Sequence, residues 1–390
     1  MEALKFTGSG SEYFKIWIVN ILLTIVTLGL YTPWAKVRNR RYFYANSVLA
    51  DRNFEYHATG KQLFIGFLIA MVFFIAYVIL GEVYPLGNLI LFAVLFVAIP
   101  WLVWRSLIFN MKMTSFSNVH FAFTGKLGKA YINFFVFPFF LILALYGGPI
   151  LSVVAMPMLM EVGAPSWVAI LIPILMIASF VLAFYLMAVV KKRNTEYVIN
   201  GSRYGQGKFE AKLKAKRFMM INLKTLGLSM LFMIFFSIIL GATGVMDSLA
   251  VLGDPEAMKS GRMSPEFLKS MGIIYGVMIL IMIPILAYSL TRQRTYIYDN
   301  TLLDDRISFN STLRARDMMF VMFTNILMVF LSLGFATPWA KVRMAKLVLE
   351  NTEVDTSEGF DDYLTQKQDE VSSLGEQIGD AFDIDVGVAF

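Results

Sequence analysis

The sequence predicts a polytopic α-helical membrane protein of the all-α class, with short cytoplasmic β-hairpins and internal pseudo-symmetry. Three observations predict this: an apolar composition, eight long apolar segments and a heptapeptide that occurs twice. The chain has 390 residues, of which 57% are hydrophobic, and its mean hydropathy is +0.64. Soluble domains use roughly 45 to 50% apolar residues, so this composition favours a membrane protein.

The apolar segments set the number of expected membrane helices. About 20 helical residues cross the roughly 30 Å of hydrocarbon in a bilayer. Residues 1–12 contain no basic region of the kind that opens a signal peptide, and no small-residue cleavage site follows a short apolar core. We therefore expect the first segment to stay in the mature protein. The segments are 13–33, 62–81, 86–104, 131–160, 166–190, 218–245, 271–291 and 318–340.

The repeated heptapeptide TPWAKVR closes the first and the last apolar segment, at 32–38 and 337–343. The match extends backwards in register, so that Asn20 corresponds to Asn325 and Gly29 to Gly334. Identity over seven residues that include Trp and Pro indicates an internal repeat. We therefore relate residues 13–61 to 318–354, within a membrane domain at 1–349 that precedes an acidic soluble tail at 350–390.

The distribution of basic residues predicts the orientation. Four longer connecting segments hold 24 Lys and Arg, whereas the three between them hold three. Basic loops stay in the cytoplasm, so we place the four longer segments there. Each contains β-branched and aromatic runs around a polar turn and is expected to form a β-hairpin. The hairpin segments begin at residues 40, 110, 195 and 294, and Asn46, Asn200 and Asn300 fall at matching places in three of them.

A fifth hairpin is expected to be divided between the two ends of the chain. The opening residues LKFTGSG resemble a second strand, and KLVLENTEVD aligns with a first strand through Asn351. Pairing of residues 4–8 with 347–353 would close a set of five units and leave no sheet edge unpaired.

Closure of that set conflicts with eight full crossings, which would put both termini outside. Two readings stay open. In one, segments 13–33 and 318–340 are re-entrant helical pairs that bend near Gly29 and Gly334, giving six crossings. In the other, both segments simply span, because 21 apolar residues are long enough.

Two further segments carry structural expectations. Residues 131–160 exceed the hydrocarbon thickness as one helix and contain Gly147, Gly148 and Pro149, so a kink or break is expected there. The tail holds 12 Asp and Glu against Lys367 alone, and it is either a docking helix or disordered. Its apolar residues at mostly helical intervals are Phe360, Tyr363, Leu364, Val371, Leu374, Ile378 and Phe382.

The heptapeptides supply the candidate site. Their tryptophans and basic residues suit an anchor at the lipid headgroups, and their identity also suits a site for a lipid headgroup or an anionic solute. The two asparagines are expected either to form interhelical hydrogen bonds or to face each other across a polar path. The candidate lipid or solute contacts are Asn20, Trp34, Lys36, Arg38, Asn325, Trp339, Lys341 and Arg343.

Nothing in the sequence indicates catalysis. No carboxylate lies deep in an apolar segment, which counts against a carboxylate-coupled transporter. The two histidines, His57 and His120, lack a pattern of further ligands, and there is no cysteine. We expect no enzyme activity, no cofactor and no metal. Nucleic-acid binding is not expected either, because the basic residues lie in short loops between apolar segments.

The motifs TPWAKVR, FTGSGSEYF and ANSVLADRNFEYHATGKQL resemble the YjgN-like family of bacterial inner-membrane proteins, which is a domain of unknown function. The resemblance covers most of residues 4–350. It implies several spans in the bacterial cytoplasmic (inner) membrane, and no established reaction. We expect contact with anionic membrane lipids and passage or handling of a small solute or lipid. The alternative is a scaffold whose hairpins and acidic tail recruit a cytoplasmic protein. The oligomeric state does not follow from the sequence.

Overall fold

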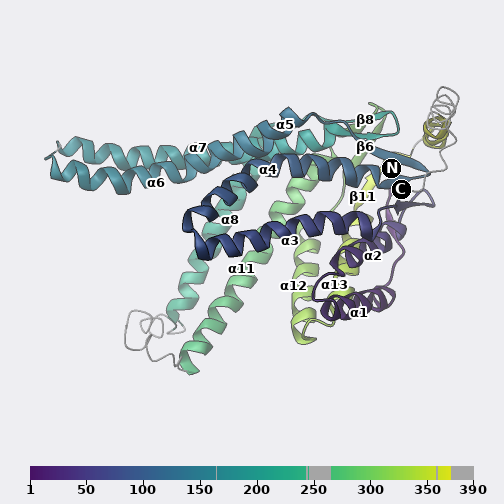
Figure 1. Ribbon diagram of the computed structural model, residues 1–390, viewed down its shortest axis with the longest axis horizontal. Helices are drawn as coiled ribbons and strands as arrows, with labels where there is room; N and C mark the ends of the chain where they lie inside the picture. Colours follow the sequence, from purple (N-terminus) through teal and green to yellow (C-terminus); the bar gives the residue numbers. More distant parts are fainter. Residues whose placement is uncertain (164, 243–244, 246–264, 357–358, 370–390) are drawn as a thin grey trace.

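The computed structural model describes residues 1–390 apart from 164, 243–244, 246–264, 357–358 and 370–390. The described chain alternates helices with β-hairpins, and long helices extend away from one sheet (Figure 1). Four units have the order helix, strand, strand, helix. They are α2 (Thr32–Ala45), β3 (Ser47–Leu49), β4 (Arg52–Tyr56) and α3 (Gly60–Val83); α4 (Pro85–Lys112), β5 (Thr114–Phe116), β6 (Val119–Phe123) and α5 (Leu127–Tyr131), which continues into the π-helix η1 (Ile132–Val136) and α6 (Phe137–Glu161); α7 (Ser166–Gly201), β7 (Ser202–Tyr204), β8 (Gly207–Ala211) and α8 (Ala215–Ala242); and α11 (Pro265–Tyr298), β9 (Thr301–Leu303), β10 (Ile307–Ser311) and α12 (Ala315–Leu331).

The two chain ends together form a fifth unit of the same kind. Helix α13 (Thr337–Glu350) leads into β11 (Thr352–Val354), which pairs antiparallel with β1 (Glu2–Ala3). The same N-terminal segment continues as β2 (Lys5–Phe6), which pairs with β3, and α1 (Gly10–Val26) follows. The amide of Leu4, between β1 and β2, donates to the carbonyl of Thr352 at 2.9 Å. The expected pairing of the two ends is therefore present.

This pairing closes the sheet on itself. Among the described residues the sheet has eleven strands in the order β1-β11-β10-β9-β8-β7-β6-β5-β4-β3-β2, and neighbouring strands pair antiparallel. Because β1 and β2 are consecutive parts of one segment, the two ends of that order meet. The all-α class predicted from the sequence is wrong in this respect: the hairpins are not separate, but form one continuous ring of strands.

Local sequence explains why each hairpin starts where it does. A Ser or Thr opens the first strand of all five units, and its hydroxyl donates to the carbonyl four residues earlier, which ends the preceding helix. These bonds are 2.7 to 2.9 Å long and involve Ser47, Thr114, Ser202, Thr301 and Thr352.

The turns between paired strands are tight. The residue pairs Ala50 and Asp51, and Asp304 and Asp305, have positive φ angles between 47° and 57°. Two consecutive residues with positive φ are the signature of the type I′ turn, whose twist matches that of paired strands. The predicted hairpins are thus present at all four places. The asparagines fit less well, because Asn46 and Asn300 immediately precede their strands whereas Asn200 lies two residues before β7.

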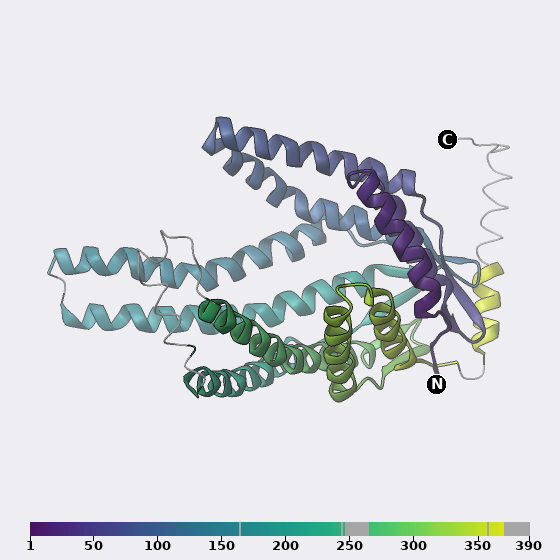
Figure 2. The same cartoon turned by 90° about the horizontal axis from the view of Figure 1, so that it is seen from below.

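Six helices are long and apolar enough to cross a membrane within the described ranges, and most of their surface is exposed. The candidate spans are 60–82, 86–112, 127–159, 170–201, 215–242 and 267–298. Figure 2 shows them as pairs that diverge from the sheet. The expected break at Gly147 to Pro149 is absent, because α6 continues through this stretch. The irregular turn lies earlier, in η1.

The first and last apolar segments form helical pairs instead of long helices. Helices α1 and α12 have 17 residues, and α2 and α13 have 14. Gly29 and Gly334 lie in the reversals with φ of +91° and +93°, which glycine adopts without strain. In each pair, proline occupies the first turn of the returning helix, where its missing N–H has no cost. The structure thus has the bend that the sequence predicted at both glycines.

Candidate functional site

The interior of the strand ring is lined by one phenylalanine from each complete hairpin. Side chains alternate between the two faces of a strand, and the middle residue of every five-residue strand points inward. These residues are Phe54, Phe121, Phe209 and Phe309, and Leu4 takes the corresponding place in the N-terminal segment. The ring centroids of Phe121 and Phe209 are 6.4 Å apart, and those of Phe209 and Phe309 are 6.0 Å apart. We call these five residues the phenylalanine layer.

The phenylalanine layer lies between two chambers of an apolar lumen. The inner chamber, of about 430 Å³, is bounded by the ends of the helices that lead into the strands, including Tyr44, Met111 and Ile297. The outer chamber, of about 230 Å³, is bounded by the far ends of the strands. Both chambers share the four phenylalanines. Drug-sized and lipid-like ligands occupy mostly apolar cavities of roughly 300 to 1,000 Å³, so the lumen can accept an apolar molecule.

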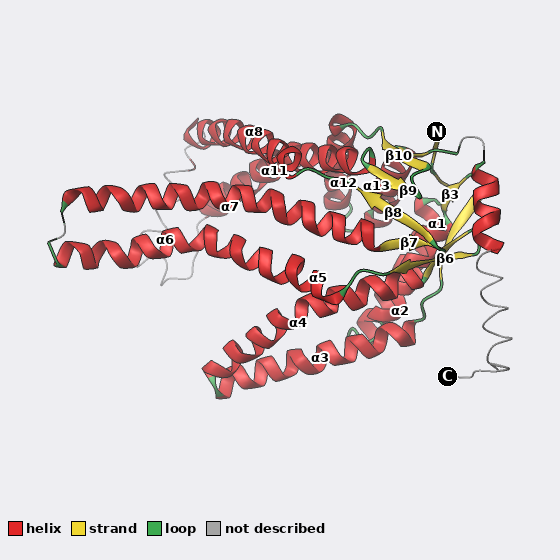
Figure 3. Cartoon of the chain, turned by 90° about the horizontal axis from the view of Figure 1, so that it is seen from above, coloured by secondary structure: helices red, strands yellow, loops and turns green. Residues whose placement is uncertain are grey.

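A short helix from the tail closes the outer chamber. Residues 360–369 are helical and lie beyond the strands, on the side opposite the long helices (Figure 3). Phe360, Tyr363 and Leu364 are buried against strand residues such as Leu49 and Leu303. The docking segment expected in the tail is therefore present over these residues, whereas its continuation from Val371 to Phe382 lies outside the described range. The described part of the acidic tail is thus integrated with the sheet.

Polar contacts fix this tail helix at its rim. Asp304, in the turn between β9 and β10, accepts a hydrogen bond from the Tyr363 hydroxyl at 2.9 Å and lies 3.3 Å from Nζ of the buried Lys367. It also accepts from the Lys208 amide at 2.7 Å. Burial of the Asp304 carboxyl acts to raise its pKa, but these hydrogen bonds and the Lys367 charge outweigh it and lower the pKa below 3.8. On the other side of the ring, Arg52 pairs with Asp361 at 3.2 Å.

The two tryptophans of the repeated heptapeptides lie in equivalent protein surroundings. Trp34 of α2 packs against Gly60 and against Phe64, whose ring centroid is 5.1 Å away. Trp339 of α13 packs in the same way on Gly10 of α1, with the Phe14 ring at 5.2 Å. Each tryptophan therefore joins the two helices that flank one hairpin.

The asparagines bond to arginines of their own helical pairs. The Arg38 guanidinium donates to Oδ1 of Asn20 at 3.2 Å, and the Asn20 amide donates to Asn39 at 3.0 Å. In the last pair, Arg343 donates to Oδ1 of Asn325 at 3.0 Å.

The Asn325 amide donates to the Ala340 carbonyl at 3.0 Å. Both asparagines thus form interhelical hydrogen bonds, which is the first of the two arrangements expected from the sequence. Lys36 and Lys341 are exposed on the same helices, so contact of the heptapeptides with lipid stays a prediction.

None of the eight residues predicted as lipid or solute contacts lines the lumen. Sequence reasoning missed the phenylalanine layer because the phenylalanines lie about 70 to 100 residues apart along the chain. A usable signal was present, since every second strand carries a phenylalanine at its middle position.

Comparison with known proteins places this architecture in a bacterial family. Inner membrane protein YjgN of Salmonella typhimurium strain LT2 is 29% identical over 360 residues, which cover 90% of this chain and 88% of that protein. The protein of the same name from Escherichia coli O157:H7 is 34% identical over 137 residues, which cover 35% of this chain and 34% of that protein. No solved structure matches.

These likenesses and the six apolar helices make this chain a multi-pass protein of the bacterial cytoplasmic membrane. The family described as bacterial protein of unknown function DUF898 matches residues 1–381, and the chain belongs to that family.

Proposed function

We propose that this protein binds an apolar molecule in the lumen of its strand ring and handles or passes it between the membrane and the cytoplasm. The observation that carries the proposal is the phenylalanine layer, which links two apolar chambers of about 430 and 230 Å³. Aromatic side chains provide large apolar contact without charge. This lining suits a lipid acyl chain or a similar apolar solute, and it does not suit an ion.

The position of the inner chamber supports a source in the membrane. Its wall includes the last turns of α4, α7 and α11, which are themselves candidate membrane spans. The basic ends of these helices support a position of the ring at the cytoplasmic side. The five helix and hairpin units are, in this proposal, repeats that surround one axis, and the lumen follows that axis.

The tail helix supports handling in preference to a permanently open passage. Its buried side chains cover the outer chamber, so a bound molecule enters from the helix side. A scaffold that recruits a partner through the acidic tail has less support, because the described part of the tail is already held by the ring.

Photo-crosslinking tests the proposal. Purified protein is mixed with a fatty acid that carries a diazirine in its chain, and crosslinked peptides are identified by mass spectrometry. We expect crosslinks on β4, β6, β8 and β10, and about a tenfold lower yield in Phe209→Asn, because a buried amide disfavours an apolar ligand. Phe309→Trp keeps the lining apolar but fills the lumen and should lower the yield too.

The control is Ser308→Ala, at the preceding position of β10, where the side chain faces away from the lumen. Equal yields in wild type and Phe309→Trp, or crosslinks confined to the outer faces of the long helices, would overturn the proposal.

A further inference from the structure

A second cavity lies outside the lumen, between the start of α5 and the end of α7. Its volume is about 520 Å³, and it shares no lining residue with the inner or outer chamber. Four cationic side chains line it without an ion pair in the described part of the chain. They are Lys126, Lys129, Arg193 and Arg203. We call this cavity the basic groove.

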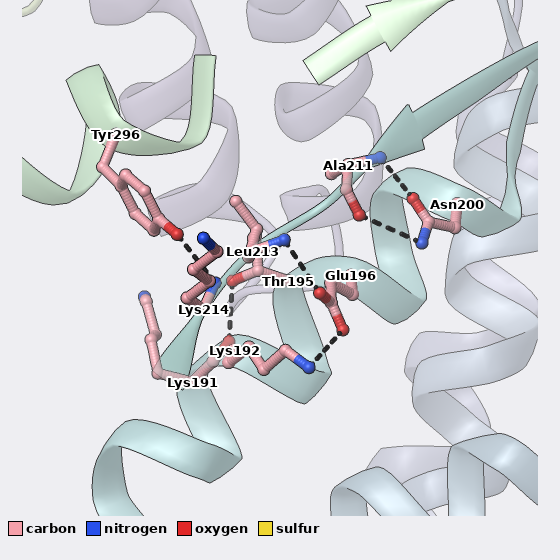
Figure 4. A network of polar contacts seen from close by, with 9 residues as sticks. All are labelled: Lys191, Lys192, Thr195, Glu196, Asn200, Ala211, Leu213, Lys214 and Tyr296. Atoms are coloured by element: carbon pink, nitrogen blue, oxygen red, sulfur yellow. Dashed lines mark hydrogen bonds and ion pairs between the residues drawn. The ribbon is translucent and has the colours of Figure 1, made fainter. Parts of the chain in front are cut away.

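The one carboxylate at the basic groove is already neutralised. Glu196 pairs with Lys192 at 3.2 Å and accepts the Leu213 amide at 3.0 Å, as Figure 4 shows. Figure 4 also shows the Asn200 side chain fixing the backbone of Ala211. The remaining cations therefore face a cavity with an excess of positive charge, which is the environment that a phosphate group favours.

The floor of the basic groove is ordered before any ligand arrives. The indole N–H of Trp104 donates to the Gly125 carbonyl at 2.7 Å, and the Tyr197 hydroxyl donates to the Lys126 carbonyl at 3.1 Å. The Arg203 guanidinium donates to the Asn200 and Ser202 carbonyls at 2.9 and 2.7 Å. These bonds fix the backbone that carries Lys126 and the guanidinium of Arg203, which lowers the entropy lost on binding.

The π-helix η1 forms part of the same wall, through Ile132 and the buried Asn133. Single π-turns within α-helices are frequent at functional sites. Below η1, α6 exposes Phe139, Phe140 and Leu143 along a candidate membrane span. The cations thus lie where a headgroup would lie, beside an apolar helix surface that suits acyl chains.

We infer that the basic groove binds the phosphate of an anionic phospholipid, with Lys126, Lys129, Arg193 and Arg203 around the headgroup. Lys129 is the third residue of α5. The third residue is acidic in two other units, where it is Glu12 of α1 and Asp317 of α12. The corresponding residue of α8 is Arg217, so this position alone does not define the site, which is defined by the cavity between α5 and α7. This inference goes beyond the proposed function, because neither chamber of the lumen contributes to it.

The test titrates the full-length protein in neutral detergent with dihexanoyl phosphatidylglycerol and counts bound lipid by native mass spectrometry. Phosphatidylcholine of the same chain length is the zwitterionic comparison. We expect tighter binding of phosphatidylglycerol, and an affinity about 25-fold lower in Lys129→Gln with Arg203→Gln, since each basic side chain near an anionic lipid contributes roughly a factor of five. The charge-conserving pair Lys129→Arg and Arg203→Lys should stay within about threefold of wild type, which separates charge from folding.

The matched control is Lys5→Gln with Arg306→Gln, which removes two exposed cations that do not line the groove, one on β2 and one in the turn between β9 and β10. Equal weakening in the control and the groove variant, or equal affinity for the two lipids, would overturn the inference. Inorganic phosphate distinguishes the source of the ligand: failure of 10 mM phosphate to displace the lipid supports a lipid site, whereas full displacement would overturn the lipid assignment in favour of a soluble phosphate.

Discussion

The Tyr363 hydroxyl donates a hydrogen bond to Oδ2 of Asp304 at 2.9 Å and so joins the tail helix to the turn between β9 and β10. The same carboxylate lies 3.3 Å from Nζ of Lys367. One rim residue thus holds two side chains from successive turns of the tail helix, and this explains how ten residues of an acidic tail stay on the sheet.

Asp304→Asn should loosen the tail helix. The amide keeps the size of the carboxyl and tolerates the positive φ of 52° at this position, but it loses the charge that pairs with Lys367. We expect docking to weaken by about 1 kcal/mol and amide hydrogen exchange in residues 360–369 to accelerate about fivefold. Asp305→Asn, in the same turn with a φ of 53°, is the control. Unchanged exchange in Asp304→Asn would show that apolar contacts alone hold the helix.

Acid should release the tail helix as well. The pKa of Asp304 is lowered in the docked state, so its stabilising effect is complete above the ordinary value of 3.8 and is lost as the pH falls through the lowered pKa. Hydrogen exchange of residues 360–369 at pH values from 6 down to 3 measures this. The acceleration at low pH should be smaller in Asp304→Asn, and identical profiles in both proteins would contradict the assignment.

Gly60→Ala should destabilise the protein. A Cβ at this position would overlap the Cδ1 atom of Trp34, so the indole must move. Overpacking of this kind costs about 1 to 3 kcal/mol, which thermal unfolding in detergent would detect as a lower midpoint. Gly10→Ala should behave alike, because it would overlap Trp339. At Gly66, within α3, no atom lies within 4 Å of a new Cβ, and Gly66→Ala should leave the midpoint unchanged or raise it.

The helical pairs at the two chain ends predict where water-soluble thiol reagents react. The chain has no cysteine. A single cysteine introduced at Lys5, Lys36 or Lys341 therefore shows on which side of the membrane that position lies. If α1 with α2, and α12 with α13, enter and return on one side, all three cysteines react from the cytoplasm in oriented vesicles. Labelling of Lys5→Cys and Lys36→Cys from opposite sides would instead support full crossings by both segments.

The sequence predicted local features of this fold, such as its hairpins and the pairing of its end strands. The pairing of the chain ends followed from the resemblance of LKFTGSG and KLVLENTEVD to the two strands of a hairpin. The bends at Gly29 and Gly334 were one of two readings, because 21 apolar residues are also long enough to span. The limits of the terminal strands differ by a few residues from those expected. The sequence predicted strands at 4–8 and 347–353, whereas the structure has them within 2–6 and at 352–354. Short strands have weak patterns, and the partner strand decides their limits.

The lumen could not be predicted in the same way. Alternation in β8 shows that Phe209 and Glu210 face opposite sides, but it does not show that five hairpins close around one axis. That closure depends on pairings between strands such as β6 and β7, which are separated by two long helices. Likewise, Trp34 and Trp339 are suited to a membrane interface by residue type, and only the arrangement in space shows that each packs on a glycine.

The closure of the ring by residues 2–6 has a consequence for biosynthesis. Strand β1 is synthesised more than 340 residues before its partner β11. Until β11 emerges, the growing sheet has two open edges that can recruit other chains. A nascent chain arrested before Thr352 is therefore a hazard for aggregation. The same closure pairs β11 with β1, so that a chain that starts in another hairpin turn, with its native ends joined by a linker, should preserve the assembled ring.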